Sequence, residues 1–188
     1  MLMHLTLKKM NKHKSIGKLM SLALRHNPGV LKLELDDLGW ANVSQLIAGL
    51  NRKGIKMDLD FLTEIVETND KQRYAFNADK TKIRANQGHS IKVDLELTEQ
   101  EPPHTLYHGT VHKFMEAIRD KGLLKMSRQH VHLSHTKETA ITVGSRRGKP
   151  VILKVEAKKM HANGYKFYRS KNGVWLTDQV PAEYILEH

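Results

Sequence analysis

The sequence contains no cysteine at any of its 188 positions. A disulfide framework, a thiolate zinc site and a cysteine nucleophile are therefore excluded, and nothing points to an oxidising compartment. Long apolar runs are also missing, because segment 1–7 is too short for a signal sequence and no stretch reaches the roughly 18 apolar residues of a membrane-spanning helix. Aromatic residues are scarce at 6%, but 39% hydrophobic residues suffice for ordinary cores. We expect a soluble, cytoplasmic, monomeric protein.

Acidic residues are also in short supply. The chain has 20 aspartates and glutamates against 31 lysines and arginines, which gives a formal net charge of +11. Such a surplus favours polyanionic partners, because each phosphate that a protein neutralises releases condensed counterions. Basic proteins without such a role also exist, so charge favours nucleic-acid binding without deciding it.

The N-terminal half predicts three helices followed by a β-hairpin. Apolar residues recur at helical spacing over 15–26, after a loose segment 1–13, and Asn27-Pro28 ends the pattern. A short strand is expected at 40–43, followed by a helix that Ser44 caps and Gly54 closes. A further helix is expected at 59–67, starting near Asp58 or Asp60, and the hairpin strands are expected at 73–76 and 81–85. This is the order of a winged-helix domain, which we place at 1–97.

A polar segment at 98–104 contains two of the five prolines in sequence and is the predicted linker. Beyond it, residues 105–188 predict a mixed lobe of short strands and helices. Strands are expected at 105–108, 131–134, 150–156, 165–168, 173–177 and 182–186, and helices at 112–121 and 136–143. The expected fold class is therefore α+β in two lobes.

Arg25 and His26 form the first candidate site, at the C-terminal end of the first predicted helix. Two cations there complement the negative end of the helix dipole. Equally, a guanidinium and a titratable imidazole at a helix end can bind a phosphate and move a proton.

Arg73 and Arg84 lie on the predicted hairpin, where basic side chains commonly contact nucleic-acid backbone without doing chemistry. The residues alone leave these interpretations open.

A second candidate site lies in Leu106–Thr110. Here an apolar strand leads to His108 and Gly109, and the hydroxyl of Thr110 follows directly. Because glycine has no side chain, another molecule can approach the backbone at this point. The alternative is that His108 is an ordinary residue at the end of a strand.

A third candidate lies at 128–134, where polar and apolar residues alternate. The alternation predicts that one strand face carries Arg128, His130, His132 and Ser134. Histidines in this pattern could bind zinc together with His108, but the arginine and serine suit an anion better, so we expect no metal. The later segment Gly144–Pro150 is basic but lacks the P-loop spacing, and no strand–GxGxxG–helix unit occurs, so a dinucleotide would not bind through a Rossmann fold.

Taken in order, these segments resemble the RNA 2′-phosphotransferase family, also called tRNA 2′-phosphotransferases, from about residue 15 to 186. The matching motifs are Leu22–Pro28, Gly39-Trp40, Lys71–Tyr74, Gln87–Ser90, Leu106–Thr110, His130–Ser134, Val143–Arg146 and Asn172–Thr177. Two positions depart from the family pattern: Tyr74 stands where phenylalanine is commoner, and Arg147 stands where the family often has histidine.

The resemblance implies a winged-helix lobe that binds RNA and an ADP-ribosyltransferase-like lobe, with a central split sheet, that binds NAD. In that family an RNA 2′-phosphate attacks the ribose carbon that bears nicotinamide. The ribose 2″-hydroxyl of the resulting RNA-2′-phospho-ADP-ribose intermediate then attacks the phosphate. RNA with a free 2′-hydroxyl, ADP-ribose 1″,2″-cyclic phosphate and nicotinamide are the products, as in tRNA splicing.

The resemblance also implies residue roles. The family's catalytic set corresponds to Arg25, His26, Arg73 and Arg128, and its NAD-site signature to His108, His132 and Val174. Further NAD contacts are expected from Gly109, Thr110, Ser134 and Arg146, and RNA contacts from Arg84, Gln87 and His89. Gly109 is expected to leave room for the nicotinamide, and Val174, where many relatives in the wider class have glutamate, argues against ordinary protein ADP-ribosylation.

Two rival functions remain at this point. A winged-helix nucleic-acid binder with a nucleotide-sensing second lobe would explain the charge without turnover. An ADP-ribosyltransferase that caps nucleic-acid terminal phosphates would keep the first chemical step and lose the second. Release of cyclic phosphate separates the second rival from 2′-phosphotransfer.

Overall fold

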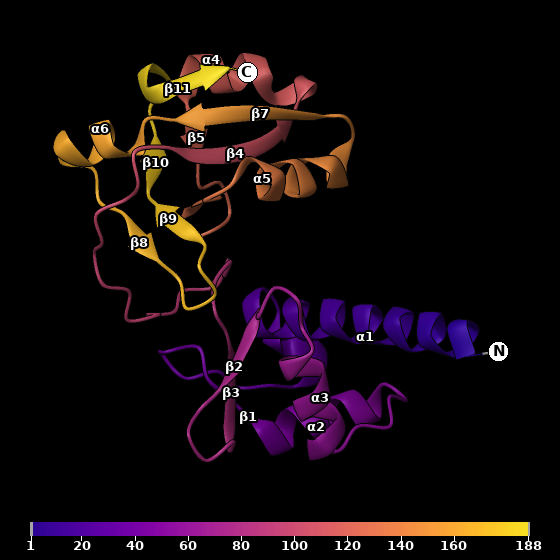
Figure 1. Ribbon diagram of the computed structural model, residues 1–188. Coiled ribbons are helices and arrows are strands. Elements are labelled where there is room, and N and C mark those ends of the chain that lie inside the picture. Colours follow the sequence, from indigo (N-terminus) through magenta and orange to yellow (C-terminus); the bar gives the residue numbers. More distant parts are fainter. Residues whose placement is uncertain (1, 188) are drawn as a thin grey trace. The chain divides into compact units, whose positions relative to one another are not determined.

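The computed structural model describes the backbone of residues 2–187 and the side chains of residues 13–187 (Figure 1). The chain forms two compact units, one up to Glu96 and the other from Leu97 onward. Each unit has its own cluster of buried apolar residues. None of the described helices is long and apolar enough to cross a membrane.

The first unit contains three α-helices and one antiparallel sheet with the strand order β1-β3-β2. Its elements are α1 (Leu2–Arg25), the 3-10 helix η1 (Pro28–Leu31), β1 (Ala41–Asn42), α2 (Val43–Arg52), α3 (Leu59–Glu67), β2 (Tyr74–Phe76) and β3 (Lys82–Ala85). This is the predicted order of helices and hairpin, with β1 pairing with β3 through Ala41 and Ile83. The winged-helix assignment itself stays a prediction.

Helix α1 begins at Leu2, so the expectation of a loose segment over 1–13 is wrong for the described residues. No glycine or proline occurs before Gly17, and the stretch that precedes it is rich in leucine, methionine and lysine, which favour helix. Helix α2 also starts differently from the prediction. The side chain of Asn42, not Ser44, accepts backbone N–H bonds at its start, while Asp58 caps α3 as predicted.

The core of the first unit forms between α1 and the elements that follow it. Ile16, Met20 and Leu24 of α1 are buried together with leucines of α2 and α3. The hydroxyl of Tyr74 on β2 donates to the carbonyl of Gly17 at 2.5 Å, and it pairs with the Ser21 hydroxyl at 2.7 Å. The hairpin is thereby held against α1.

The second unit is a mixed α/β assembly of three small antiparallel sheets, with strand orders β11-β7-β4, β6-β9-β8 and β10-β5. Its strands are β4 (Leu106–Val111), β5 (Leu123–Leu124), β6 (Val131–Leu133), β7 (Pro150–Val155), β8 (Tyr168–Arg169), β9 (Trp175–Thr177), β10 (Gln179–Val180) and β11 (Ile185–Glu187). Its helices are η2 (His112–Phe114), α4 (Met115–Lys121), α5 (Lys137–Gly144), η3 (Ser145–Arg147), α6 (Ala157–Ala162) and η4 (Ala182–Tyr184). A bridge between Tyr107 and Ser134 joins the two larger sheets.

Several elements of this unit differ from the prediction. Strands β5 and β10 and helix α6 were not expected, and 182–184 is a 3-10 turn before β11. Helix α5 lies along β4 and β7 (Figure 1). The ADP-ribosyltransferase-like arrangement stays a prediction.

Residues 98–104, predicted as a linker, run against the second unit. Glu99 bridges Tyr168, and the N–H of Gln100 donates to the carbonyl of Phe167 at 2.8 Å. On the other side of the boundary, the Glu96 carboxylate lies 3.4 Å from the Arg84 guanidinium of the first unit. The stretch between these attachments is therefore short.

Candidate active site

Arg25 and His26 stand where α1 ends, and a later loop holds both of them. The N–H of Ser90 donates to the carbonyl of Arg25 at 2.9 Å, while the Ser90 hydroxyl lies 2.9 Å from Nδ1 of His26. Ser90 therefore fixes the end of the helix and the plane of the imidazole ring together.

Arg73 comes to the same place from the start of the hairpin. An Nη atom of Arg25 donates to the Arg73 carbonyl at 3.5 Å, and the Arg73 guanidinium donates to the Asn69 side chain at 3.3 Å. Burial raises the pKa of the neighbouring Tyr74 hydroxyl, against the lowering effect of its bond to Ser21 and the charges of Arg25 and Arg73. Three of the four predicted catalytic residues therefore gather within the first unit.

His89 and Arg84, predicted as RNA contacts, are internal residues of this unit. His89 is 1% exposed, and neither of its ring nitrogens has a hydrogen-bond partner among the described residues. Arg84 is 4% exposed, and its guanidinium donates to the Leu38 carbonyl and stacks over the Trp40 ring. The sequence suggested exposed side chains at both positions, whereas both are buried, and their role as RNA contacts stays a prediction. The RNA role of the half-buried Gln87 stays a prediction.

The burial of His89 makes the stability of this unit depend on pH. Burial lowers the pKa of His89 from 6.5 to about 4, assisted by the positive charges of Arg25, His26 and Arg84. The unfolded chain binds the proton more readily, so stability is full above about pH 6.5 and is lost as pH falls toward 4. The loss reaches about 3 kcal/mol in the limit. Denaturant unfolding at pH 7 and pH 4.5 measures it.

Glutamine at position 89 is the matching control, because it is neutral at both pH values. His89→Gln is expected to flatten this part of the pH dependence, whatever its effect on stability at pH 7. An unchanged difference between the two pH values would show that His89 is not the group responsible.

In the second unit, His108 and His132 are linked directly. The imidazole Nδ1 of His108 lies 3.0 Å from the His132 carbonyl, which can only accept, so Nδ1 carries the proton. Burial lowers the pKa of His108, and the charges of Arg128 and Arg147 lower it further, against the opposing effect of that hydrogen bond. His108 is therefore neutral, with Nε2 as an acceptor.

Three arginines lie around these histidines. The Arg128 guanidinium donates to Nδ1 of His132 at 3.5 Å. Desolvation lowers the pKa of Arg128, as do the charges of Arg147 and Arg146, so these guanidiniums are close enough to repel one another. A concentration of positive charge beside neutral imidazoles suits an anionic ligand with a polar uncharged part. Over the part of the chain that the structure describes, histidine and acidic side chains form no group of three that could hold a metal ion.

The prediction that 128–134 forms one long strand face is wrong, because β6 is confined to Val131–Leu133. Arg128 lies in a turn before β6, where its N–H donates to Lys125, and only its side chain reaches His132. The ring of His130 packs against that of Tyr168, with centroids 5.8 Å apart. Ser134 exchanges backbone hydrogen bonds with Tyr107.

On the side where a Cβ would project, Gly109 faces α5 and not the open space that was expected, and its contact with NAD stays a prediction. A Cβ atom at this position would lie 1.9 Å from the carbonyl oxygen of Ala140 on α5. The glycine therefore allows β4 and α5 to pack closely. Of the other predicted NAD contacts, Thr110 is buried, Arg146 is exposed, and half-buried Val174 exchanges hydrogen bonds with Ser170.

Comparison with known proteins adds an independent observation. Residues 11–179 match the family described as "RNA 2'-phosphotransferase, Tpt1 / KptA family". The chain belongs to the RNA 2′-phosphotransferase family. It is 59% identical over 172 residues to a probable RNA 2′-phosphotransferase of Flavobacterium johnsoniae, an alignment that covers 92% of this chain and 94% of that relative. Probable RNA 2′-phosphotransferases of Rhodopirellula baltica and Acaryochloris marina are 52% and 50% identical, over 91% and 93% of this chain and 94% and 96% of theirs.

Sequence reasoning missed two side chains in this RNA 2′-phosphotransferase family member. Ser90 was quoted only as part of a motif, although it contacts both Arg25 and His26. Arg147 was noted only as a departure, although its charge acts on both Arg128 and His108. Membership of the motif Gln87–Ser90 was the only signal for the first, and the paired arginines of 146–147 were the signal for the second.

Proposed function

We propose that this chain removes an internal 2′-phosphate from RNA in an NAD-dependent reaction. The products are RNA with a free 2′-hydroxyl, ADP-ribose 1″,2″-cyclic phosphate and nicotinamide. The observation that carries the proposal is the grouping of Arg25, His26 and Arg73 at the end of α1, in a chain that belongs to the RNA 2′-phosphotransferase family.

The residues of the first unit suit the phosphate end of this reaction. Two guanidiniums hold a phosphate dianion in a bidentate manner that lysine cannot reproduce, and they spread the negative charge that develops as the phosphate is attacked. His26, oriented by Ser90, is placed to take or give a proton. Arg128 would supply the third guanidinium.

The residues of the second unit suit NAD, which is consumed as a co-substrate. NAD supplies the ribose carbon and hydroxyl on which the phosphate is transferred. Nε2 of neutral His108 is an acceptor for an uncharged polar group such as an amide N–H. Arg128, Arg146 and Arg147 offer the positive charge that a pyrophosphate requires.

Incubation with a short RNA carrying one internal 2′-phosphate, with and without NAD, tests the proposal. We expect NAD-dependent loss of the 2′-phosphate, with equal amounts of nicotinamide and cyclic phosphate released. Stable ADP-ribosylated RNA without cyclic phosphate would indicate a capping transferase instead. No turnover at any salt concentration or pH would indicate a binding protein and refute the proposal.

Weakening the contacts to the phosphate is expected to slow the second chemical step more than the first. Stabilising added charge on the phosphate matters chiefly when the 2″-hydroxyl attacks it. Arg73→Lys and Arg128→Lys keep a charge but lose the bidentate fork, so the ADP-ribosylated RNA intermediate should accumulate. His132→Ala, at the NAD end, should slow nicotinamide release without accumulation of the intermediate. A gel assay and a nicotinamide assay run in parallel measure both.

Arg119→Lys is the matched control, because Arg119 is exposed and pairs with Glu187 away from the site residues. It should behave as the unaltered protein. Accumulation of intermediate in His132→Ala, with none in either site arginine variant, would contradict this division of labour.

A further inference from the structure

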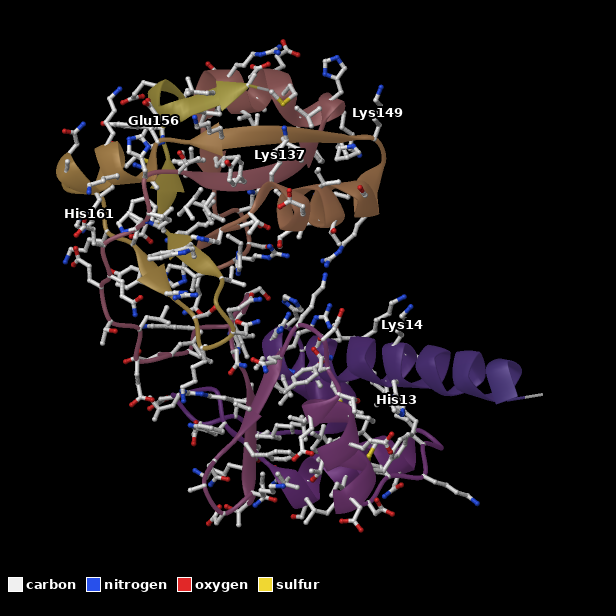
Figure 2. The ribbon with its side chains drawn as sticks, in the orientation of Figure 1. His13, Lys14, Lys137, Lys149, Glu156 and His161 are labelled. Atoms are coloured by element: carbon white, nitrogen blue, oxygen red, sulfur yellow. The ribbon has the colours of Figure 1, made fainter. Side chains whose placement is uncertain are left out.

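Helix α1 has one buried and one exposed face. Ile16, Met20 and Leu24 lie in the core, and on the same side the His13 ring packs against Phe61. On the other side Lys14, Lys18 and Leu22 are exposed and follow one another at intervals of about one helical turn. Figure 2 shows Lys14 and His13 leaving α1 in opposite directions. We call Lys14, Lys18 and Leu22 the α1 outer face.

The α1 outer face leads to the proposed phosphate site. Arg25 follows Lys18 after two turns on the same side of the helix, because seven residues at about 100° each return to nearly the same direction. From Lys14 to Arg25 the helix rises roughly 16 Å. The row is long enough to accompany a polymer, not only a single phosphate.

The positive charge of this face is not neutralised within the first unit. The first acidic residue of the chain is Glu34, so α1 has none. The Glu64 carboxylate lies 3.9 Å from His13, on the opposite side of α1. Among the described side chains, neither Lys14 nor Lys18 has a carboxylate within ion-pairing distance. Surface lysines with a purely solubilising role are more usually interspersed with acids.

We propose that the α1 outer face binds the phosphate backbone of the RNA strand that flanks the 2′-phosphorylated nucleotide. This inference rests on the proposed function and extends it from one nucleotide to a longer substrate. Lysine is a flexible point charge that neutralises phosphates without reading bases, so the contact is independent of sequence. An anionic membrane fits less well, because a helix bound at a membrane surface needs an exposed apolar face, and in the part of α1 with described side chains the apolar face lies in the core.

Substrate length is the first test. In Lys14→Gln/Lys18→Gln, the KM for a long RNA with one 2′-phosphate is expected to rise roughly tenfold, with kcat unchanged. The KM for a 2′-phosphorylated dinucleotide should not change, because it does not reach Lys18. Lys53→Gln/Lys56→Gln removes the same charge from another part of the first unit and should leave both KM values alone. Glutamine has nearly the helix propensity of lysine, so the fold is retained.

Binding of unphosphorylated RNA is the second test, and it needs no turnover. Each phosphate contact on a single strand contributes roughly 0.7 to the slope of log affinity against log salt, so the double variant should lose about 1.4. A slope equal to that of the control variant, or a KM that changes equally for both substrates, would overturn the inference. So would loss of binding to anionic vesicles with RNA binding intact. Absence of turnover together with the expected slope change would refute only the proposed function.

Discussion

Replacing Arg25, Arg73 or Arg128 by alanine is expected to lower turnover of a 2′-phosphorylated RNA by at least about a hundredfold. Removing one preorganised donor from a site that stabilises developing negative charge commonly has an effect of this size. The Arg25 guanidinium donates to the backbone carbonyl of Arg73, so both residues lie near the end of α1. Under the proposed function, each alanine would leave one guanidinium fewer to hold the phosphate dianion. Single-turnover rates with saturating RNA and NAD measure the effect on chemistry.

Folding must be checked in the same variants, because Arg25 also donates to the Arg73 carbonyl. Thermal unfolding should change little, since that contact is long and only partly buried. Arg119→Ala removes an equal charge from an exposed ion pair and should keep near-normal turnover. Near-normal rates in all three site variants would show that the catalytic set has been assigned wrongly.

Gly109→Val is expected to destabilise the second unit by about 3 kcal/mol or more. The new Cβ would lie 1.9 Å from the Ala140 carbonyl oxygen and 2.9 Å from the backbone nitrogen of Gly144. Backbone atoms cannot rotate away as a side chain can, so α5 would have to separate from β4. Thermal unfolding followed by circular dichroism, together with the yield of soluble protein, measures the loss.

Gly17→Ala provides the contrast, because a Cβ there meets only the Tyr74 hydroxyl at 3.8 Å. Alanine in the interior of a helix is favoured over glycine, so stability should rise by up to about 1 kcal/mol. If Gly109→Val instead kept its melting temperature and lost only NAD binding, the earlier interpretation of Gly109 as a ligand space would be correct after all.

The sequence was most informative where one element carries its own signals. Helix α3 spans Leu59–Glu67 as predicted, since its apolar periodicity and the Asp58 cap agree. Helix α5 begins one residue later than expected, after the Thr136 cap. The start of α1 was missed because its apolar spacing was recognised only from residue 15 onward. Strand β6 is shorter than its alternation suggested, because strand length depends on its partner, and β9 offers only Trp175–Thr177.

The residues of the candidate site also differ in how far the sequence could predict their positions. Arg25 and His26 could be placed from the end of a helix, and the family motifs pointed to Arg73. The bond between Ser90 and His26 could not be foreseen, because it depends on how the loop after β3 returns to α1. Gly109 has two physical explanations, close packing or a close ligand, and only the position of Ala140 distinguishes them. Arg84 and His89 carry a charge and a titratable ring that suggest a surface, yet they lie inside.

The attachments on either side of the boundary leave a short tether between the two units. Glu96 is held by Arg84 and Glu99 by Tyr168, so only Leu97 and Thr98 lie between the two anchored ends. A tether this short gives each unit a high effective concentration of the other. If the proposed residues divide between the units, as Arg25 and Arg128 do, then an RNA bound to one and NAD bound to the other meet as an intramolecular pair. Residues inserted between Leu97 and Thr98 would lower the effective concentration of one bound substrate relative to the other, without changing a residue of either site.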